Sequence, residues 1–308
     1  MTSLCEIENQ AGLCRITSGW KKPDLPIDWV RRYWRDVHSP AISRRAGLYD
    51  YRHYQYDPVQ EDVLSPLEGV EYACPSMEQL MWTSDVRYRS TADLPAFDIS
   101  PQGQAKADLL GDIELIVDKS TTYRTVDDNG HTFVDETGVA TPQGPCASPT
   151  FTFFIRAKSD EVSFRACLKA VSETWSKKLG VVRLRLSLFD APDMEKERLA
   201  GYPIKTHPVE QQYQACIEIA LDTIARARSL ITDEDGIDYA QHIKTIHAYP
   251  VRVIYTSVYS GRPTLVGLRG YPAYQAITAL NADNQRQATL LEWMYGPVAE
   301  DGTAEDCL

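Results

Sequence analysis

Two segments of the chain repeat each other without a gap, and this repeat constrains the fold more than any other feature. The first, SRRAGLYDYRHYQYD, occupies residues 43–57, and the second, SKKLGVVRLRLSLFD, occupies residues 176–190. Both begin with Ser and two basic residues, reach Gly at the fifth position and end in Asp ten residues later. A repeat of this kind indicates that the chain arose by tandem duplication.

The surroundings of the two copies follow the same predicted order, strand–helix–strand–strand–helix–strand. Shifted backward, residues 27–34 align with 160–167, and both helices then carry acidic residues in the first turn, where the helix dipole favours them. In the first half we expect strands at 13–20, 48–56, 69–74 and 112–126 and helices at 26–45 and 76–90. In the second half we expect strands at 150–158, 181–189, 214–220 and 249–259 and helices at 160–179 and 221–231.

This order is that of the ferredoxin-like βαββαβ unit, whose two helices cover only one face of its sheet. Two such units can close their open faces on each other, so the predicted fold class is α+β, with both units forming a barrel inside one chain. The predicted divisions are a first unit at 10–130, a linker at 131–147, a second, degenerate unit at 148–262 and a C-terminal helical extension at 263–308.

Composition excludes several classes of protein. The formal net charge of −11 argues against nucleic-acid and anionic-membrane partners, which need basic faces. No apolar run reaches the roughly 18 residues that span a bilayer, and the N-terminus, MTSLCEIENQ, lacks the features of a secretory signal. The seven scattered cysteines form no CxxC pair, which favours reduced thiols in a cytoplasmic protein.

The first half contains a motif that the second half lacks. Its segments YWRDVHSP, AGLYDY and GVEYACPSMEQL resemble the EthD-type domain of the dimeric α+β barrel superfamily, with the pattern Trp-x-x-x-His-x-Pro at Trp34, His38 and Pro40. The resemblance covers residues 10–125, and Val171 stands opposite His38 in the second half. It implies an intramolecular pair of ferredoxin-like units. The superfamily includes polyketide cyclases, decarboxylases, lactone isomerases, cofactor-free monooxygenases and haem enzymes.

The repeated strand differs in character between the two halves. One face of the second copy is aliphatic, as expected under a helix, whereas its counterpart in the first copy is polar and aromatic; the two sets are Val182, Leu184, Leu186, Leu188 and Tyr49, Tyr51, His53, Gln55. The opposite faces hold Arg183, Arg185, Ser187, Phe189 and Asp50, Arg52, Tyr54, Tyr56. A bulge could exchange the faces, so the pattern leaves open which set lines the barrel.

His38 is the strongest candidate for catalysis, because an imidazole can take and return a proton near neutral pH. We also predict catalytic roles for Tyr51 and His53, and substrate-binding roles for Tyr33, Trp34, Arg52, Tyr54, Arg183 and Arg185. Asp36 lies only two residues from His38 and should face another side, so it is a poor orienting partner. The structural alternative is that His38 only interacts with a helix C-terminus and the tyrosines only anchor the edge of the core.

No histidine pair has the i, i+4 spacing of a helical metal site, so we expect no metal. We also expect no dissociable cofactor, although a haem would need only one axial histidine and stays open. The predicted function is general acid/base chemistry on an aromatic or polyketide-like, oxygen-rich metabolite, of the lyase or isomerase type. The alternative is a non-catalytic accessory or ligand-binding protein. Either would have one small-molecule pocket per chain, and a homodimer could form through outer surfaces.

Overall fold

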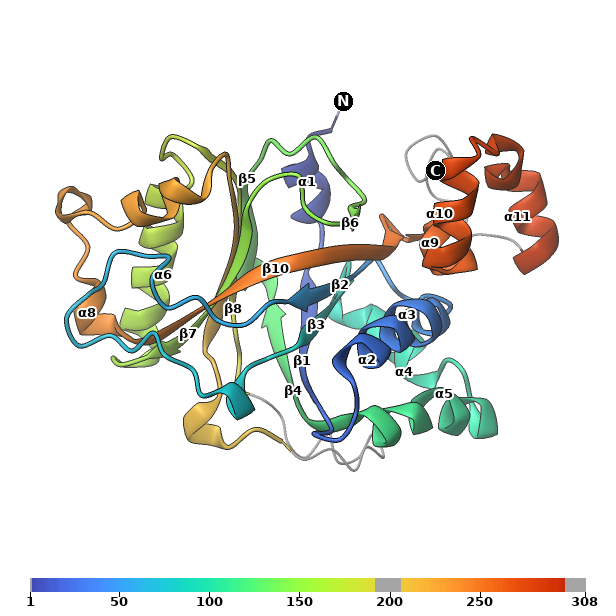
Figure 1. Ribbon diagram of the computed structural model, residues 1–308, viewed down its shortest axis with the longest axis horizontal. Coiled ribbons are helices and arrows are strands. Elements are labelled where there is room, and N and C mark those ends of the chain that lie inside the picture. The colour runs from blue at the N-terminus through green and yellow to red at the C-terminus, as the bar shows by residue number, and fades with distance from the viewer. Residues whose placement is uncertain (1, 192–205, 297–308) are drawn as a thin grey trace.

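The computed structural model describes residues 2–191 and 206–296 (Figure 1). The first βαββαβ unit contains β1 (Leu13–Lys21), α2 (Ile27–Tyr33), η1 (Trp34–His38), α3 (Ser39–Ile42), β2 (Asp50–Tyr56), β3 (Trp82–Tyr88), α4 (Leu94–Ile99), α5 (Gly103–Ile116) and β4 (Val117–Val126). The second contains β7 (Thr150–Ala157), α6 (Glu161–Trp175), β8 (Val181–Leu188), β9 (Ala215–Leu221), η6 (Ile224–Ser229), α8 (Tyr239–His242) and β10 (Ile243–Tyr259).

The remaining elements flank or join these units. They are α1 (Leu4–Glu8), β5 (Gly130–Asp135), β6 (Gln143–Gly144), β11 (Arg262–Pro263), α9 (Leu265–Arg269), α10 (Tyr271–Ala279) and α11 (Ala288–Tyr295). Short 3-10 turns occur at η2 (Ser76–Glu78), η3 (Thr91–Asp93), η4 (Asp127–Asn129), η5 (Val209–Gln211), η7 (Asp233–Asp235) and η8 (Asp283–Arg286). Helices α9, α10 and α11 lie together at one end of the molecule (Figure 1).

The strands form one antiparallel sheet in the order β4-β1-β3-β2-β10-β7-β9-β8-β5. Within each unit the order is fourth, first, third, second, which is the ferredoxin-like arrangement. The units meet where the second part of β10 pairs with β2 and where β5, which follows β4, pairs with β8. A bridge between Arg124 and Asp190 brings β4 against the end of β8 as well. The sheet therefore curls into a barrel within one chain, which confirms the predicted fold class.

Two glycines show that the sequence repeat is also a structural repeat. Gly47 and Gly180, which occupy the same position of the repeat, have φ of 79° and 86°. A β-carbon at Gly47 would lie 2.6 Å from the carbonyl oxygen of Asp93, and one at Gly180 would lie 2.5 Å from a carboxylate oxygen of Asp222. Both positions turn the chain sharply from a helix into the next strand, and the left-handed conformation favours Gly at each.

Several predicted elements are wrong. Residues 69–74 lie in the loop between β2 and β3 instead of forming a strand, and 76–90 contain β3 instead of a helix. The second helix of this unit is α5, which includes the first five residues of the predicted strand 112–126. Strand β3 is buried on both faces, and its sequence, WTSDVRY, alternates between apolar and polar residues except at Ser84, which stands on the otherwise apolar helix side.

Two further predicted intervals differ in content from what the structure has there. Residues 131–147, predicted as a linker, contain most of β5 and all of β6, and both strands join the sheet. Residues 221–231, predicted as a helix, contain only the 3-10 turn η6. The six cysteines that the structure describes have free thiols, and Cys307 lies outside the described residues. Among the described helices, none is both long and apolar enough to cross a membrane.

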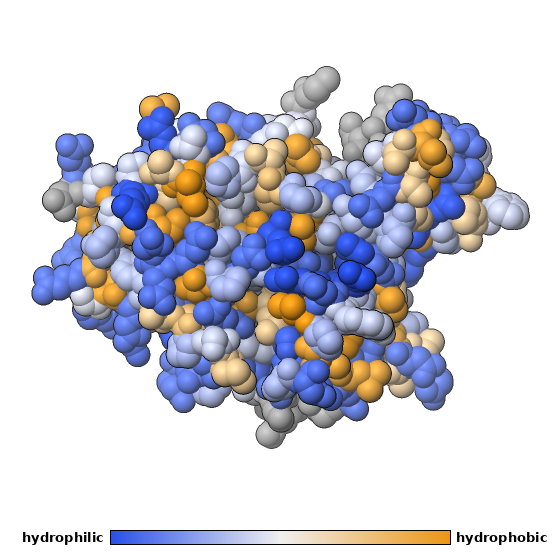
Figure 2. Space-filling view, viewed as in Figure 1, coloured by the Kyte–Doolittle hydropathy of each residue, from blue (hydrophilic) through white to orange (hydrophobic). Residues whose placement is uncertain are grey.

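The two units bury different kinds of side chain between helices and sheet. In the second unit α6 covers β8 and β9 through a continuous aliphatic and aromatic cluster that includes Val171, Leu184 and Leu186. In the first unit the equivalent layer includes His38, Ser39, His53 and Ser84, all buried. On the outer face shown in Figure 2, hydrophilic and hydrophobic residues are interspersed.

Candidate functional site

Strand β2 separates the predicted site residues into two groups on opposite faces of the sheet. Its residues 51, 53 and 55 face the helices, and its residues 50, 52, 54 and 56 face the barrel interior. The helix-side cluster comprises Tyr33, Trp34, His38, Ser39, Tyr51, His53, Ser84 and Asp112. The barrel cluster comprises Glu8, Asp50, Arg52, Tyr54, Asp85, Arg87, Asp135, Arg183, Arg185 and Glu218. The structure therefore does not bring the nine predicted residues into one pocket.

His38 is held by a carboxylate that the sequence reading did not identify. Its Nδ1 lies 2.9 Å from Oδ2 of Asp112 on α5, and the two side chains are 6% and 10% exposed. When the N–H of Nδ1 donates this hydrogen bond to Asp112, Nε2 carries the lone pair of a base. Asp36 instead forms a two-pronged pair with Arg35 at 2.6 and 2.7 Å. The orienting partner is thus supplied by a distant helix.

A π-helical turn at Trp34–His38 positions the histidine. The backbone N–H of Ser39 donates to the carbonyl of Trp34, five residues earlier. Pro40 has no N–H to give to the preceding turn, so a regular α-helical ladder cannot continue through this point. The rings of Trp34 and His38, four residues apart, lie 4.1 Å from each other. Single π-helical turns of this kind are frequent at functional sites.

Hydroxyl groups line the sheet side of the same layer. The hydroxyls of Ser39 and Tyr51 lie 3.0 Å apart, and the indole N–H of Trp34 donates to Ser84 Oγ at 3.2 Å. Burial raises the pKa of Tyr51, so its phenol stays protonated and can donate a hydrogen bond at neutral pH. Burial and the neighbouring carboxylate of Asp112 raise the pKa of Tyr33. The layer therefore offers a base and at least one neutral donor.

His53 has a different character from His38. Burial, together with electrostatic repulsion from His38 and Arg35, lowers the pKa of His53 to about 3. Its ring is stacked at 6.3 Å from Trp34 and at 6.5 Å from Tyr255. Its Nδ1 is buried and has no hydrogen-bond partner among the described residues. A neutral imidazole of this kind suits hydrogen bonding better than proton transfer near pH 7.

The barrel cluster is a network of ion pairs. Arg183 contacts Glu218 at 2.8 Å and Glu8 at 2.9 Å, and also pairs with Asp135. Arg87 contacts Asp85 at 2.6 Å. The phenol of Tyr54 donates to Glu218 at 3.0 Å. Arg183, one of the predicted substrate-binding arginines, is therefore already engaged by carboxylates of the protein itself.

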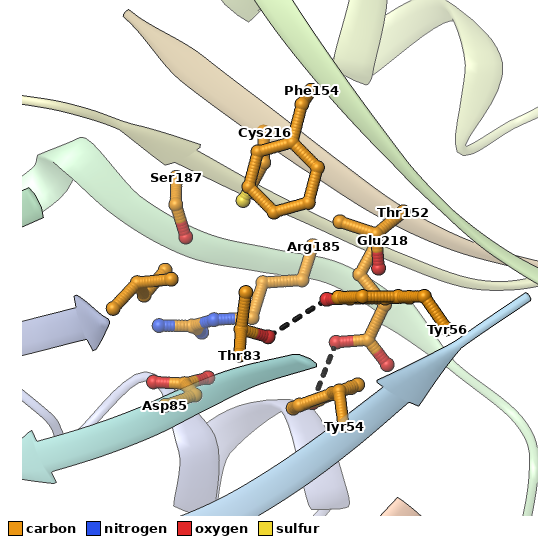
Figure 3. A pocket seen from close by; sticks show the side chains of 11 residues that line it. Tyr54, Tyr56, Thr83, Asp85, Thr152, Phe154, Arg185, Ser187, Cys216 and Glu218 are labelled. Carbon is orange, nitrogen blue, oxygen red and sulfur yellow. Dashed lines mark hydrogen bonds between the residues drawn. The ribbon is translucent and has the colours of Figure 1, made fainter. Parts of the chain in front are cut away.

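A small cavity adjoins this network (Figure 3). Its volume of about 20 Å³ holds roughly one water molecule, so it cannot receive an aromatic metabolite as it stands. It is lined by Ile16, Tyr54, Tyr56, Thr83, Asp85, Thr152, Phe154, Arg185, Ser187, Cys216 and Glu218. Within the described residues, no three His, Cys, Asp or Glu side chains are grouped so as to hold a metal ion.

Asp112, Ser84 and Glu8 were missed by the sequence reading. Asp112 did leave a signal, because it lies on the same helical stripe as Leu109, Ile113 and Ile116, where a carboxylate is out of place. Ser84 left none, since the predicted helix at 76–90 covers its strand. Glu8 belongs to α1, an element that we did not predict although Ser3 and Glu6 form a capping box at its start.

No family model matches the chain, and no curated protein matches it. Among solved structures, an anthrone oxidase-like protein is similar at 10% identity and a TM-score of 0.46, over 79% of this chain and 92% of that one. A candidate monooxygenase from Fusobacterium nucleatum is similar at 11% identity and a TM-score of 0.45, over 81% and 96%. A mutant chlorite dismutase from Candidatus Nitrospira defluvii is similar at 8% identity and a TM-score of 0.34, over 82% and 94%.

Proposed function

We propose that the protein is a small-molecule enzyme in which His38, oriented by Asp112, transfers a proton on an aromatic or polyketide-like, oxygen-rich substrate. The observation that carries this proposal is the 2.9 Å contact between His38 Nδ1 and Asp112 Oδ2 in a buried layer. The equivalent layer of the second unit is aliphatic. An aliphatic core would be more favourable for stability, because buried polar groups that lose water without full compensation cost about 1–3 kcal/mol each. The polar layer of the first unit therefore suggests a function other than stability.

The other members of the helix-side cluster supply the remaining roles. His38 Nε2 would remove a proton from carbon or oxygen of the substrate, and Asp112 would stabilise the imidazolium that results. The protonated phenol of Tyr51 would donate to the enolate or phenolate oxygen that forms. Rings of Tyr33 and Trp34 would flank the flat part of the substrate. Tyr51 is bonded to Ser39 in this structure, so substrate entry would exchange that contact for a new one.

The reaction class we propose is a lyase or isomerase step through an enol or enolate: decarboxylation, dehydration or cyclisation. Each of these steps moves protons and an electron pair within the substrate and needs no dissociable cofactor. We further propose membership of the EthD-type branch of the dimeric α+β barrel superfamily, on the Trp34, His38 and Pro40 pattern. The free thiols support a reducing, cytoplasmic setting.

Two experiments in sequence test this function. Metabolites from a cell extract that raise the melting temperature of the protein would first identify a ligand, and its turnover would then be followed with His38→Gln, Asp112→Asn and wild type. We expect His38→Gln to lower kcat on the order of 10²-fold or more, while ligand affinity and melting temperature change little. The kcat of Asp112→Asn should fall between those of wild type and His38→Gln, because an amide can hold the imidazole ring in place but does not stabilise an imidazolium.

The opposite pattern would support the alternative of a non-catalytic ligand-binding protein. In that case His38→Gln would bind the ligand as wild type does, neither protein would convert it, and Tyr51→Phe would weaken the affinity. A large loss of melting temperature in His38→Gln, with turnover unchanged, would instead assign the histidine to the structure of the helix.

A further inference from the structure

The carboxylate of Glu8 lies at the centre of the barrel cluster, and its two oxygens are held by both units. Oε1 lies 2.8 Å from Arg52 of the first unit, and Oε2 lies 2.9 Å from Arg183 of the second. Oε2 also accepts from Thr132 Oγ1 at 2.7 Å and lies 3.5 Å from Arg87. Glu8 is only 3% exposed. Charge-assisted hydrogen bonds from both sides make this a complete carboxylate-binding site.

Glu8 differs from the four other carboxylates of the cluster by its origin. Those four belong to strands of the barrel wall, β2, β3, β5 and β9. Glu8 instead ends α1, a helix of five residues near the start of the chain. The remaining contacts of this helix region include two hydrogen bonds between Asn9 and Thr132, at 2.9 and 2.8 Å, and one from Tyr49 to the carbonyl of Ile7 at 2.8 Å. The wall therefore forms a binding site for a carboxylate, here called the socket, and Glu8 is inserted into it. The socket consists of Arg52, Arg87, Thr132, Arg183 and Arg185.

The socket follows the internal repeat, whereas Glu8 does not. Arg52 is paired in register with Asp85 across β2 and β3. Arg185 is paired in register with Glu218 across β8 and β9, at the equivalent positions of the second copy. The position equivalent to Glu8 is Thr141, which lies in the connection between β5 and β6. Two arginines at equivalent positions of the repeat, Arg52 and Arg185, thus lie 2.8 and 4.0 Å from a single carboxylate that belongs to neither copy.

Arginines of both units favour an anion at the position of Glu8. Burial opposes ionisation of Glu8, but the charges of Arg183, Arg52, Arg87 and Arg185 hold its pKa well below the usual range. Burial opposes ionisation of Asp85 and Glu218 too, and Arg87 and Arg183 hold their pKa values below the usual range. Burial raises the pKa of Asp50 in spite of the nearby arginines. The position of Glu8 is therefore one that the arginines of the cluster keep suited to a carboxylate anion.

Unpartnered polar atoms extend the socket toward the cavity of Figure 3. Nε of Arg185 and Oδ1 of Asp85 are buried and have no hydrogen-bond partner among the described residues. Both side chains line the cavity, and Glu218 joins the cavity to the cluster. Buried groups of this kind are usually satisfied by a ligand or a water. A ligand whose carboxylate replaced that of Glu8 would find further polar contacts deeper in the barrel.

We propose that the barrel interior is a binding site for a small carboxylate anion and that Glu8 of α1 is its built-in occupant. This site is separate from the helix-side cluster, because β2 lies between the two, and it does not depend on the proposed function. A free carboxylate competes with Glu8 for the same arginines, so the site opens to external anions only when Glu8 is removed or α1 withdraws.

The test removes the built-in carboxylate and supplies a free one. In the full-length protein, Glu8→Ala should melt well below wild type, since buried arginines lose their partner. Sodium acetate at about 100 mM should then raise the melting temperature of the variant by about 3 °C more than equal sodium chloride. Wild type should show no difference between the two salts, because its socket is filled.

A second variant shows which groups bind the acetate. Glu8→Ala combined with Arg183→Leu removes one side of the clamp and should abolish the difference between acetate and chloride. Equal effects of both salts on Glu8→Ala, or an unchanged acetate effect in the double variant, would overturn the proposal. If Glu8→Ala does not fold in buffer, the yield of refolded protein is compared between acetate and chloride instead. A higher yield in acetate would support the site, and equal yields would count against it.

Discussion

The two units are alike inside the barrel and unlike outside it. Inside, Arg52 with Asp85 in one copy matches Arg185 with Glu218 in the other, each pair in the same register of the sheet. Outside, under the helices, the first copy has Tyr51 and His53 where the second has Leu184 and Leu186. Duplication has therefore preserved chemistry on one face of the same strand while the other face has diverged.

This difference between the two faces of the repeated strand follows from the elements that each face contacts. Residues that face the barrel contact both units, as Tyr54 of the first unit does when its phenol donates to Glu218 of the second. A change of charge there must be balanced by a second change elsewhere. The helix-side layers are separate, because each faces its own helix, so one layer could gain polar side chains while the other kept a dry core. This freedom would allow the catalytic layer that we propose to arise in one unit alone.

The largest effect should come from breaking an arginine inside the barrel. Arg52→Leu and Arg185→Leu should each lower the free energy of unfolding by about 3–5 kcal/mol, because each removes a buried positive charge that faces the carboxylate of Glu8. Urea unfolding monitored by tryptophan fluorescence measures both. We expect the two losses in the free energy of unfolding to agree within about 1 kcal/mol, because the two arginines occupy equivalent positions of the repeat. Differences in their neighbours can account for a difference of that size. A loss confined to one variant would show that the two pairs are equivalent in position only.

The next effect should separate the two helix-side layers. Leu186→Ala removes a side chain that is 2% exposed in the aliphatic cluster of the second unit and should cost about 2–5 kcal/mol. The matched change His53→Ala, at the equivalent position, should cost less at pH 7, because it also removes a buried nitrogen without a hydrogen bond. The same urea experiment compares them. A larger loss in His53→Ala would mean that the first layer is the more tightly packed of the two.

The smallest effect should be a dependence of the free energy of unfolding on pH. We expect it from the helix-side layer of the first unit and not from that of the second. The pKa of His53 is lowered from 6.5 to about 3 by burial and nearby positive charge. Between these values the unfolded chain binds a proton that the folded protein does not, so stability should fall as the pH drops from 6.5 toward 3. The slope from one such group is about 1.4 kcal/mol per pH unit.

His53→Phe keeps a ring in the layer and removes this titration. Its stability, measured by urea unfolding from pH 6.5 to 4.5, should fall less steeply than that of wild type, whereas Leu186→Phe should leave the slope unchanged. Parallel curves for His53→Phe and wild type would show that His53 takes up its proton in the folded state at ordinary pH.

The sequence was sufficient for the architecture because the repeat and the order of elements both depend on backbone geometry. It failed at β3, where Ser84 interrupts the alternation of polar residues inside the barrel, such as Asp85 and Arg87, with apolar residues outside it. It also named Arg52 and Arg183 as substrate contacts. Their partners, Glu8 and Glu218, come from elements far away in the chain, so no local pattern could show that these arginines were already paired.

The same limit applies to the histidine. The motif identified His38, Trp34 and Tyr51, and the structure places them in one layer. The orienting carboxylate at position 112 is 74 residues away in the chain. The one signal for it in the sequence is that a carboxylate stands on an otherwise apolar helical stripe. Local patterns predict which side chains carry chemistry, whereas their partners depend on tertiary packing.

Strand β10 pairs with β7 over its first part and with β2 over its second, and β2 lies about 200 residues earlier in the chain. A contact of such long range forms late, because the entropy of closing the loop must be met before the pairing stabilises anything. Until then both β2 and the end of β10 expose unpaired edges. When two chains refold close together, each edge can be met by the other chain's strand, which would build the same barrel twice from exchanged halves. The joint that closes the barrel within one chain would therefore also be its route to a domain-swapped dimer.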